Sequence, residues 1–162
     1  MNKNTKQRIT DAKINYYRTK YASYPMHLIP KATYIDSTAN GLTKCIKDFL
    51  NYSGHQAERI SSMGRVINSK KKVTDVMGRT IEVGSSKYIR PTSTAGTADI
   101  SAILNGRAVK IEVKIGKDRQ SDAQKQYEKD VTDAGGYYVI AKDFDGFIEW
   151  YDKFISDLNI SE

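Results

Sequence analysis

Polar and apolar residues alternate on both sides of an Asn-Gly pair at positions 105 and 106. The flanking runs, 99–104 and 107–115, are rich in β-prone residues. An Asn-Gly pair between two such runs is typical of a two-residue type I′ turn, because both turn positions need positive φ. The sequence therefore predicts a β-hairpin in which Ile100 lies opposite Ile111.

The alternation gives this hairpin one apolar face and one charged face. Asp99, Glu112 and Lys114 fall on the charged face, and the register makes the two acids direct cross-strand neighbours. Like charges in that position destabilise a sheet by roughly 0.2–1 kcal/mol, and a divalent cation between them would remove the repulsion. The pattern favours a metal site, but a solvated face on which lysines offset the acids has the same spacing.

Helical and strand periodicities predict the elements on either side. Leu42 and its apolar neighbours recur at helical spacing over residues 38–52. Ser121 is a good N-cap, with Gln124 as its capping-box partner. The remaining predicted elements are strands at 55–60, 73–77, 79–83 and 137–141, a helix from 121 to 134 and a last helix that begins at Asp143 or Asp145.

Charge is distributed unevenly along the chain. The net charge is +7 and the pI is about 9.3, with +5 in residues 1–40, +6 in 41–97 and −4 in 98–162. A basic half beside an acidic motif suits a polyanionic partner such as nucleic acid. Residues 1–40 also interleave tyrosines with basic residues. This segment is interpreted either as an arm that follows phosphates and stacks on bases, or as a packed extension or dimerisation arm.

Cys45 is the single cysteine, which excludes an internal disulfide and a cysteine-based zinc site, and it is expected in the core. Residues 1–6 have no apolar signal segment, and no apolar run is long enough to span a membrane. We therefore expect no membrane association and a cytoplasmic location, in a bacterium or in a phage-infected host cell.

The motif residues resemble those of a known enzyme superfamily. Asp99, followed on the next strand by Glu112-Val113-Lys114, resembles the PD-(D/E)xK nucleases. The segments 96–100 and 111–114, together with Gln124, are similar to the virus-type replication-repair nuclease (VRR-NUC) branch, akin to Holliday-junction resolvases. The resemblance covers roughly residues 40–141, and Ala98 stands where the superfamily name has Pro.

The resemblance implies an α/β fold, with a restriction-endonuclease-like α-β-β-β-α-β core of mixed sheet flanked by helices. It also implies Mg²⁺, with Mn²⁺ as a substitute, bound by Asp99, Glu112 and the Val113 carbonyl. Lys114 would position water or stabilise the transition state, and Gln124 would support the site. Candidates for a third acid are Glu58 and Asp48. The basic residues expected at DNA are Arg65, Lys70, Lys71, Lys72, Arg79, Lys87, Arg90, Lys117 and Arg119.

Taken together, the sequence predicts a basic, aromatic N-terminal extension at 1–37 and a nuclease domain at 38–162, with an inserted basic hairpin. The predicted activity is metal-dependent hydrolysis of phosphodiester bonds in duplex or branched DNA. A homodimer and a phage or mobile-element source follow from the resemblance alone. The alternatives are a restriction-type or RNA-directed nuclease, and a DNA-binding or assembly module that keeps the fold without cleaving.

Overall fold

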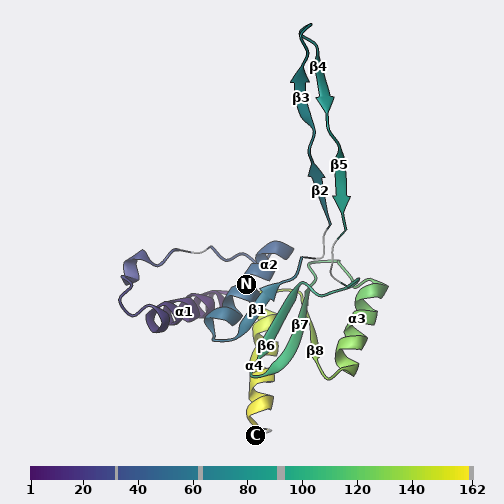
Figure 1. Ribbon diagram of the computed structural model, residues 1–162. Helices are drawn as coiled ribbons and strands as arrows, with labels where there is room; N and C mark the ends of the chain where they lie inside the picture. The colour runs from purple at the N-terminus through teal and green to yellow at the C-terminus, as the bar shows by residue number, and fades with distance from the viewer. Residues whose placement is uncertain (32, 62–63, 91–93, 161–162) are drawn as a thin grey trace. The chain divides into compact units, whose positions relative to one another are not determined.

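The computed structural model describes residues 1–31, 33–61, 64–90 and 94–160. Contacts divide the chain into two units, which we call the body (Met1–Ile60 with Ala95–Glu162) and the ribbon (Ser61–Thr94). The body contains α1 (Lys3–Lys20), the short 3-10 helix η1 (Met26–Leu28), α2 (Ala39–Tyr52), β1 (Gln56–Arg59), β6 (Ile100–Leu104), β7 (Arg107–Val113), α3 (Asp122–Asp133), β8 (Tyr137–Ala141) and α4 (Phe144–Ile160). The ribbon contains β2 (Arg65–Asn68), β3 (Lys71–Thr74), β4 (Thr80–Val83) and β5 (Ser86–Ile89) (Figure 1).

The body is built on a mixed four-stranded sheet in the order β1-β6-β7-β8. β6 pairs antiparallel with both β1 and β7, whereas β8 runs parallel to β7 after the α3 crossover. The predicted hairpin register is confirmed, because Ile100 pairs with Ile111. Asn105 and Gly106 have φ angles of 46° and 76°, as a type I′ turn requires.

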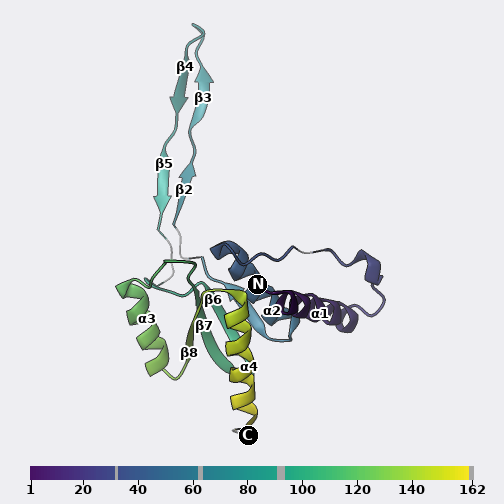
Figure 2. The same ribbon diagram turned by 180° about the vertical axis from the view of Figure 1, so that it is seen from behind.

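Helices lie on both faces of this sheet (Figures 1 and 2). Buried apolar side chains of α2 and α4 pack on the face that carries Ile100. α3 lies on the opposite face, where Gln124 contacts Glu112 and Tyr127 contacts Tyr138. No residue of α3 is fully buried, so this helix covers the charged face only in part. The expectation of a mixed sheet flanked by helices is confirmed.

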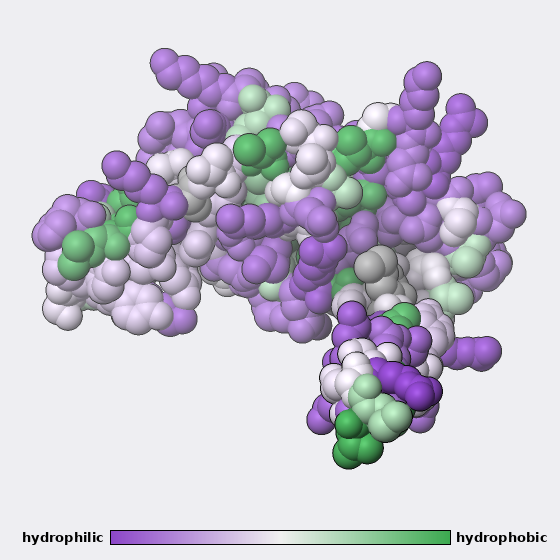
Figure 3. Space-filling view, turned by 90° about the horizontal axis from the view of Figure 1, so that it is seen from above, coloured by the Kyte–Doolittle hydropathy of each residue, from purple (hydrophilic) through white to green (hydrophobic). Residues whose placement is uncertain are grey.

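The ribbon is a long antiparallel hairpin. Its two strand pairs, β2 with β5 and β3 with β4, follow one continuous register from Arg65 opposite Ile89 to Thr74 opposite Thr80. The predicted hairpin is confirmed, but its first strand ends at Thr74 and not at residue 77, because residues 75–78 form the turn. β2 and β5, which extend the hairpin, were not predicted. Every residue of β2, β3 and β4 is exposed, and hydrophobic and hydrophilic side chains lie side by side at the ribbon's end (Figure 3).

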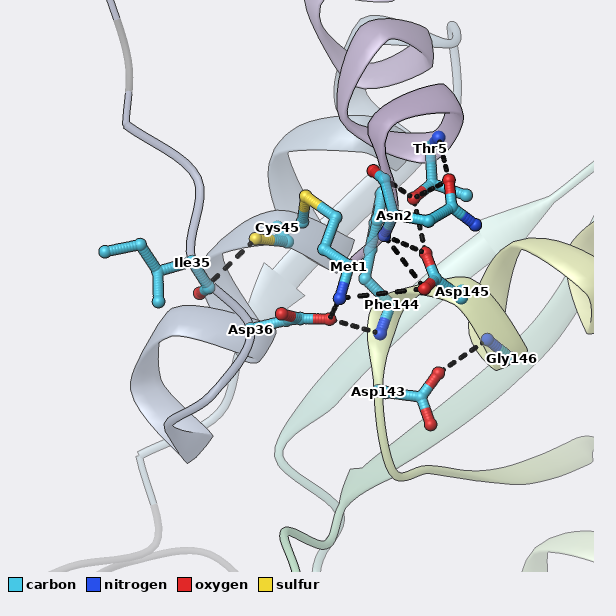
Figure 4. Close-up of polar contacts among 10 residues, drawn as sticks. All are labelled: Met1, Asn2, Thr5, Ile35, Asp36, Cys45, Asp143, Phe144, Asp145 and Gly146. Carbon is cyan, nitrogen blue, oxygen red and sulfur yellow. Dashed lines mark hydrogen bonds and ion pairs between the residues drawn. The ribbon is translucent and has the colours of Figure 1, made fainter.

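The first residues of the chain are held by acidic side chains from elsewhere in the body (Figure 4). The amino group of Met1 lies 2.8 Å from a carboxylate oxygen of Asp36 and 3.6 Å from one of Asp145. The backbone amide of Asn2 and the hydroxyl of Thr5 both donate to Asp145.

The last helix, α4, is capped by Asp143, one of the two residues predicted to begin it. The Asp143 carboxylate accepts a 2.7 Å hydrogen bond from the Gly146 amide, whereas Asp145 binds the first residues of the chain.

The predicted N-terminal extension, 1–37, belongs to the body and shares its core. Ile9 of α1 is completely buried in the same core as α2, β6 and β7. The tyrosines of α1 and of the loop after it contact one another and Tyr52 of α2, with ring centroids 5.3–6.5 Å apart: Tyr16, Tyr17, Tyr21 and Tyr24. This packing favours the packed-extension interpretation of the segment.

Cys45 is buried, as predicted, and burial raises the pKa of its thiol to about 11. None of the described helices is both long enough and apolar enough to cross a membrane.

Candidate active site

The segment before β6 is held by contacts with α3 and with the residue that follows β1. Gly96 has a φ of 79°, and a Cβ built on it would lie 2.2 Å from the carbonyl oxygen of Ala123, in the first turn of α3. Only glycine allows this close approach. Three residues later, the Asp99 carbonyl accepts a 2.8 Å hydrogen bond from the Ile60 amide. The chain is therefore positioned for Asp99 to face β7.

Asp99 lies opposite Glu112, as predicted, when the β6–β7 register is continued by one residue. One oxygen of its carboxylate, Oδ2, accepts a 2.9 Å hydrogen bond from the backbone amide of Val113. This bond fixes the carboxylate beside the end of β7, on the charged face of the sheet. Asp99 is half-buried, so water and small ions have access to it.

Glu112 is almost completely buried, with 2% of its surface exposed. Its Oε1 atom accepts a hydrogen bond from Nε2 of Gln124 and lies 3.2 Å from Nζ of Lys114. Its other oxygen, Oε2, is buried and has no hydrogen-bond partner among the described residues. A buried carboxylate oxygen without a partner is costly, because it has lost its water and gained nothing in exchange.

The environment of Glu112 disfavours its charged form. Burial is the largest cause of its raised pKa, and the charge of Asp99 raises it further. The hydrogen bond and the charge of Lys114 act in the opposite direction without cancelling the effect. Perturbed carboxylates of this kind are concentrated at functional sites, where a bound cation would reverse the penalty.

Lys114 is one of the few buried lysines of the chain, with 8% of its surface exposed. Its ammonium lies between Glu112, at 3.2 Å, and Asp118, at 3.5 Å. Its backbone amide donates a 2.9 Å hydrogen bond to the carbonyl of Ala141 on β8, so the backbone of this residue is also fixed by the sheet. The structure thus brings Lys114 to Glu112, on the face where the sequence predicts it.

Gln124 performs both tasks that the sequence suggested for it. Its Oε1 accepts a 2.9 Å hydrogen bond from the Ser121 amide, which completes a capping box at the start of α3. Its Nε2 donates to Glu112. The oxygen of this amide caps α3 and its nitrogen contacts Glu112. The start of α3 is therefore tied to the position of Glu112.

Two further side chains of this face were not singled out from the sequence. Tyr138 of β8 is half-buried, and burial together with the charge of Glu112 raises its pKa to about 12. It therefore stays a neutral hydroxyl. Lys110, paired with Tyr138 in the sheet, donates a 2.6 Å hydrogen bond to Ser101. The position of Tyr138 follows from the β7–β8 register, which the continuous apolar run at 137–141 does not reveal. Lys110 faces Ser101 through the β6–β7 register.

The two candidates for a third acid lie on opposite faces of the sheet. Glu58 is exposed and pairs with Ser101, one step along the sheet from Asp99. Asp48 is on α2, over the other face of the sheet, and lies 3.2 Å from Lys47. Among the described residues no group of three or more His, Cys, Asp or Glu side chains is close enough to hold a metal ion. Asp99 and Glu112 therefore remain the candidate carboxylate ligands.

The basic residues expected at DNA fall into two sets, and all of them are exposed. Lys117 and Arg119 are in the loop between β7 and α3, directly after Lys114. The others belong to the ribbon: Arg65, Lys70, Lys71, Lys72, Arg79, Lys87 and Arg90.

Comparison of the chain with protein-family models and with curated proteins finds no match.

Proposed function

We propose that the body is a metal-dependent nuclease that hydrolyses phosphodiester bonds of DNA. The observation that carries the proposal is the Oε2 atom of Glu112, a buried carboxylate oxygen without a partner among the described residues, beside the carboxylate of Asp99. A divalent cation would partner that oxygen and offset the repulsion between the two acids. The cation thus gives a physical reason for holding two acids together on this face of the sheet.

The donor set fits Mg²⁺ or Mn²⁺. Asp99 and Glu112 supply carboxylate oxygens, and the Val113 carbonyl is the further ligand that the resemblance implies. Mg²⁺ favours one or two carboxylates with water and phosphate oxygens in the remaining positions, so two acids suffice. When bound, the cation supplies Lewis-acid activation of water and of the phosphate.

The protein's own residues have distinct tasks in this proposal. Gln124 and Lys114 both hold Oε1 of Glu112, and Oε2, which has no partner among the described residues, would be the oxygen that ligates the cation. The Lys114 ammonium also places a positive charge where a phosphate develops negative charge. Lys117 and Arg119 follow in the adjacent loop, where they can contact neighbouring phosphates.

The element order α2, β1, β6, β7, α3, β8, with the ribbon left aside, supports assignment of the body to the restriction-endonuclease-like core and to the VRR-NUC branch. On that assignment we propose branched or junction DNA as the preferred substrate and a homodimer as the active form, since two sites can then act on two strands.

The test is cleavage of labelled four-way junction, flap and linear duplex DNA, each with Mg²⁺, Mn²⁺ or EDTA. Wild type is compared with Glu112→Gln, and with Glu149→Gln as a control, because Glu149 is an exposed acid of α4. The proposal expects metal-dependent products from wild type and the control, and none from Glu112→Gln, which still binds DNA. If all three proteins bind DNA and none cuts it with either metal, the chain is a binding module and the proposal is wrong.

A further inference from the structure

The ribbon exposes apolar side chains along its whole length, without a core to bury them. Val76 is fully exposed at the tip, and Met77 beside it is 72% exposed. Between 45% and 64% of each of the following residues is exposed as well: Val66, Ile67, Val73, Ile81, Val83 and Tyr88. A two-stranded hairpin is marginally stable alone, and apolar groups gathered on such a scaffold usually mark a binding surface.

The net charge of the ribbon indicates which kind of partner would bind it. Its 34 residues, Ser61–Thr94, carry seven basic residues and two acids. Glu82 is within ion-pair distance of Lys70, at 3.8 Å. The carboxylate of Asp75 accepts hydrogen bonds from the amides of Met77 and Arg79, at 2.9 and 2.8 Å. Both acids thus have local partners, while no ion pair is found for Lys71, Lys72 or Arg79 among the described residues.

A second copy of the same ribbon would bring the same positive charge, which opposes pairing of the two. Binding of a polyanion is instead favoured by each contact with a basic side chain, because each neutralised phosphate releases counterions. The ten residues from Arg65 to Thr74, which include β2 and β3, span about 33 Å at the rise of a β-strand, which is about one turn of B-DNA. The ribbon therefore has the charge and the length to follow a groove of duplex DNA.

The tip carries the most exposed apolar side chains among the described residues of the ribbon, Val76 and Met77. At the end of the ribbon nearest the viewer in Figure 3, hydrophobic side chains lie against strongly hydrophilic ones. In the tip turn, the Asp75 carboxylate accepts hydrogen bonds from the backbone amides of Met77 and Arg79. The side chains of Val76 and Met77 take no part in these hydrogen bonds. Apolar side chains at the end of a basic element can insert between base steps that are already weakly stacked.

We propose that the ribbon is a DNA-binding arm in which the basic shaft contacts phosphates and the Val76–Met77 tip is a wedge that packs against unstacked bases at a branch point. The inference rests on the proposed function for its choice of DNA as the ligand. It adds the element that distinguishes branched from linear DNA. The wedge contributes at a branch because bases there can be contacted without first breaking a continuous stack.

The test measures binding alone, in EDTA, with the full chain and fluorescently labelled four-way junction and linear duplex. The double variant Val76→Ser/Met77→Ser is expected to bind the junction about tenfold more weakly, and the duplex as wild type does. The double variant Lys71→Gln/Lys72→Gln is expected to weaken both, and to reduce the slope of log K against log salt by about two. Leu28→Ser/Ile160→Ser is the control, since it removes two exposed apolar side chains of the body.

A second readout is the fluorescence of 2-aminopurine placed at the branch point, which wild type alters and the tip variant does not. If the tip variant keeps the wild-type preference for the junction, the proposal that the tip is a wedge is wrong, even if the protein cleaves DNA. If the tip variant instead changes the oligomeric state without DNA, the tip is an interface between copies and the wedge is again wrong. If the wedge holds but no DNA is cut with metal, only the nuclease proposal fails.

Discussion

Gln124 donates to Glu112 with one end of its amide while the other end accepts from the Ser121 backbone. The helix cap and the candidate active site therefore share one side chain. Ser121→Ala removes only the side-chain half of the capping box and should cost about 1 kcal/mol of stability while cleavage persists. Gln124→Ala should lose similar stability and, in addition, most of the cleavage activity. Chemical denaturation and the cleavage assay measure the two effects.

Gln126→Ala is the matched control, because Gln126 is on the same helix and its side chain donates to Asp130, away from the site. If Gln124→Ala cleaves at the wild-type rate, the contact between Gln124 and Glu112 has no functional role.

Gly96→Ala should destabilise the protein by more than about 2 kcal/mol, because φ is positive there and the added Cβ meets the backbone of Ala123. The start of α3 must then move, so metal-dependent cleavage should fall as well. Gly135→Ala isolates the effect of φ: Gly135 has a φ of 82°, and a Cβ added there meets no heavy atom of the described residues within 4 Å. It should cost about 1 kcal/mol and leave cleavage intact. Equal costs for both variants would contradict the close approach of Gly96 to α3.

Ile9→Ala should cost about 2–5 kcal/mol, because Ile9 is completely buried in the core of the body. Ile160→Ala, at the exposed end of α4, is expected to change stability by less than about 0.5 kcal/mol. Urea denaturation of both variants measures the difference. A small effect of Ile9→Ala would mean that residues 1–37 are a separate extension.

Protons and metal should compete for Glu112. Its folded pKa is raised, so the folded protein binds this proton more tightly than the unfolded chain does. Without metal, the free energy of unfolding therefore decreases as the pH rises from the ordinary pKa of this carboxyl to its raised pKa. The melting temperature of Glu112→Gln minus that of wild type, measured in EDTA, should increase across that window. With Mg²⁺ the stabilisation of wild type should decrease as the pH falls through the raised pKa, and a difference independent of pH would contradict this.

The elements of the body that the sequence predicts best are those fixed by local chemistry. The Asn105-Gly106 turn sets the β6–β7 register, and with it the position of Asp99 opposite Glu112. The capping box of α3 is likewise encoded within four residues, Ser121 to Gln124.

What the sequence does not reveal depends on contacts between distant segments. Tyr138 reaches the charged face only through the parallel pairing of β8 with β7, and the run at 137–141 has no alternation to indicate its direction. β2 and β5 were missed for a similar reason. Arg65-Val66-Ile67-Asn68 does not alternate, since the ribbon has no buried face to impose a period of two.

The central claim is that Asp99 and Glu112 together hold a divalent cation. The most direct measurement is titration of Mn²⁺ into wild type, Glu112→Gln and Asp99→Asn, in which the electron paramagnetic resonance signal reports free Mn²⁺. The account predicts that wild type removes Mn²⁺ from solution, that Mg²⁺ displaces it, and that neither variant binds it. Equal binding by wild type and both variants would show that the two acids are not a metal site.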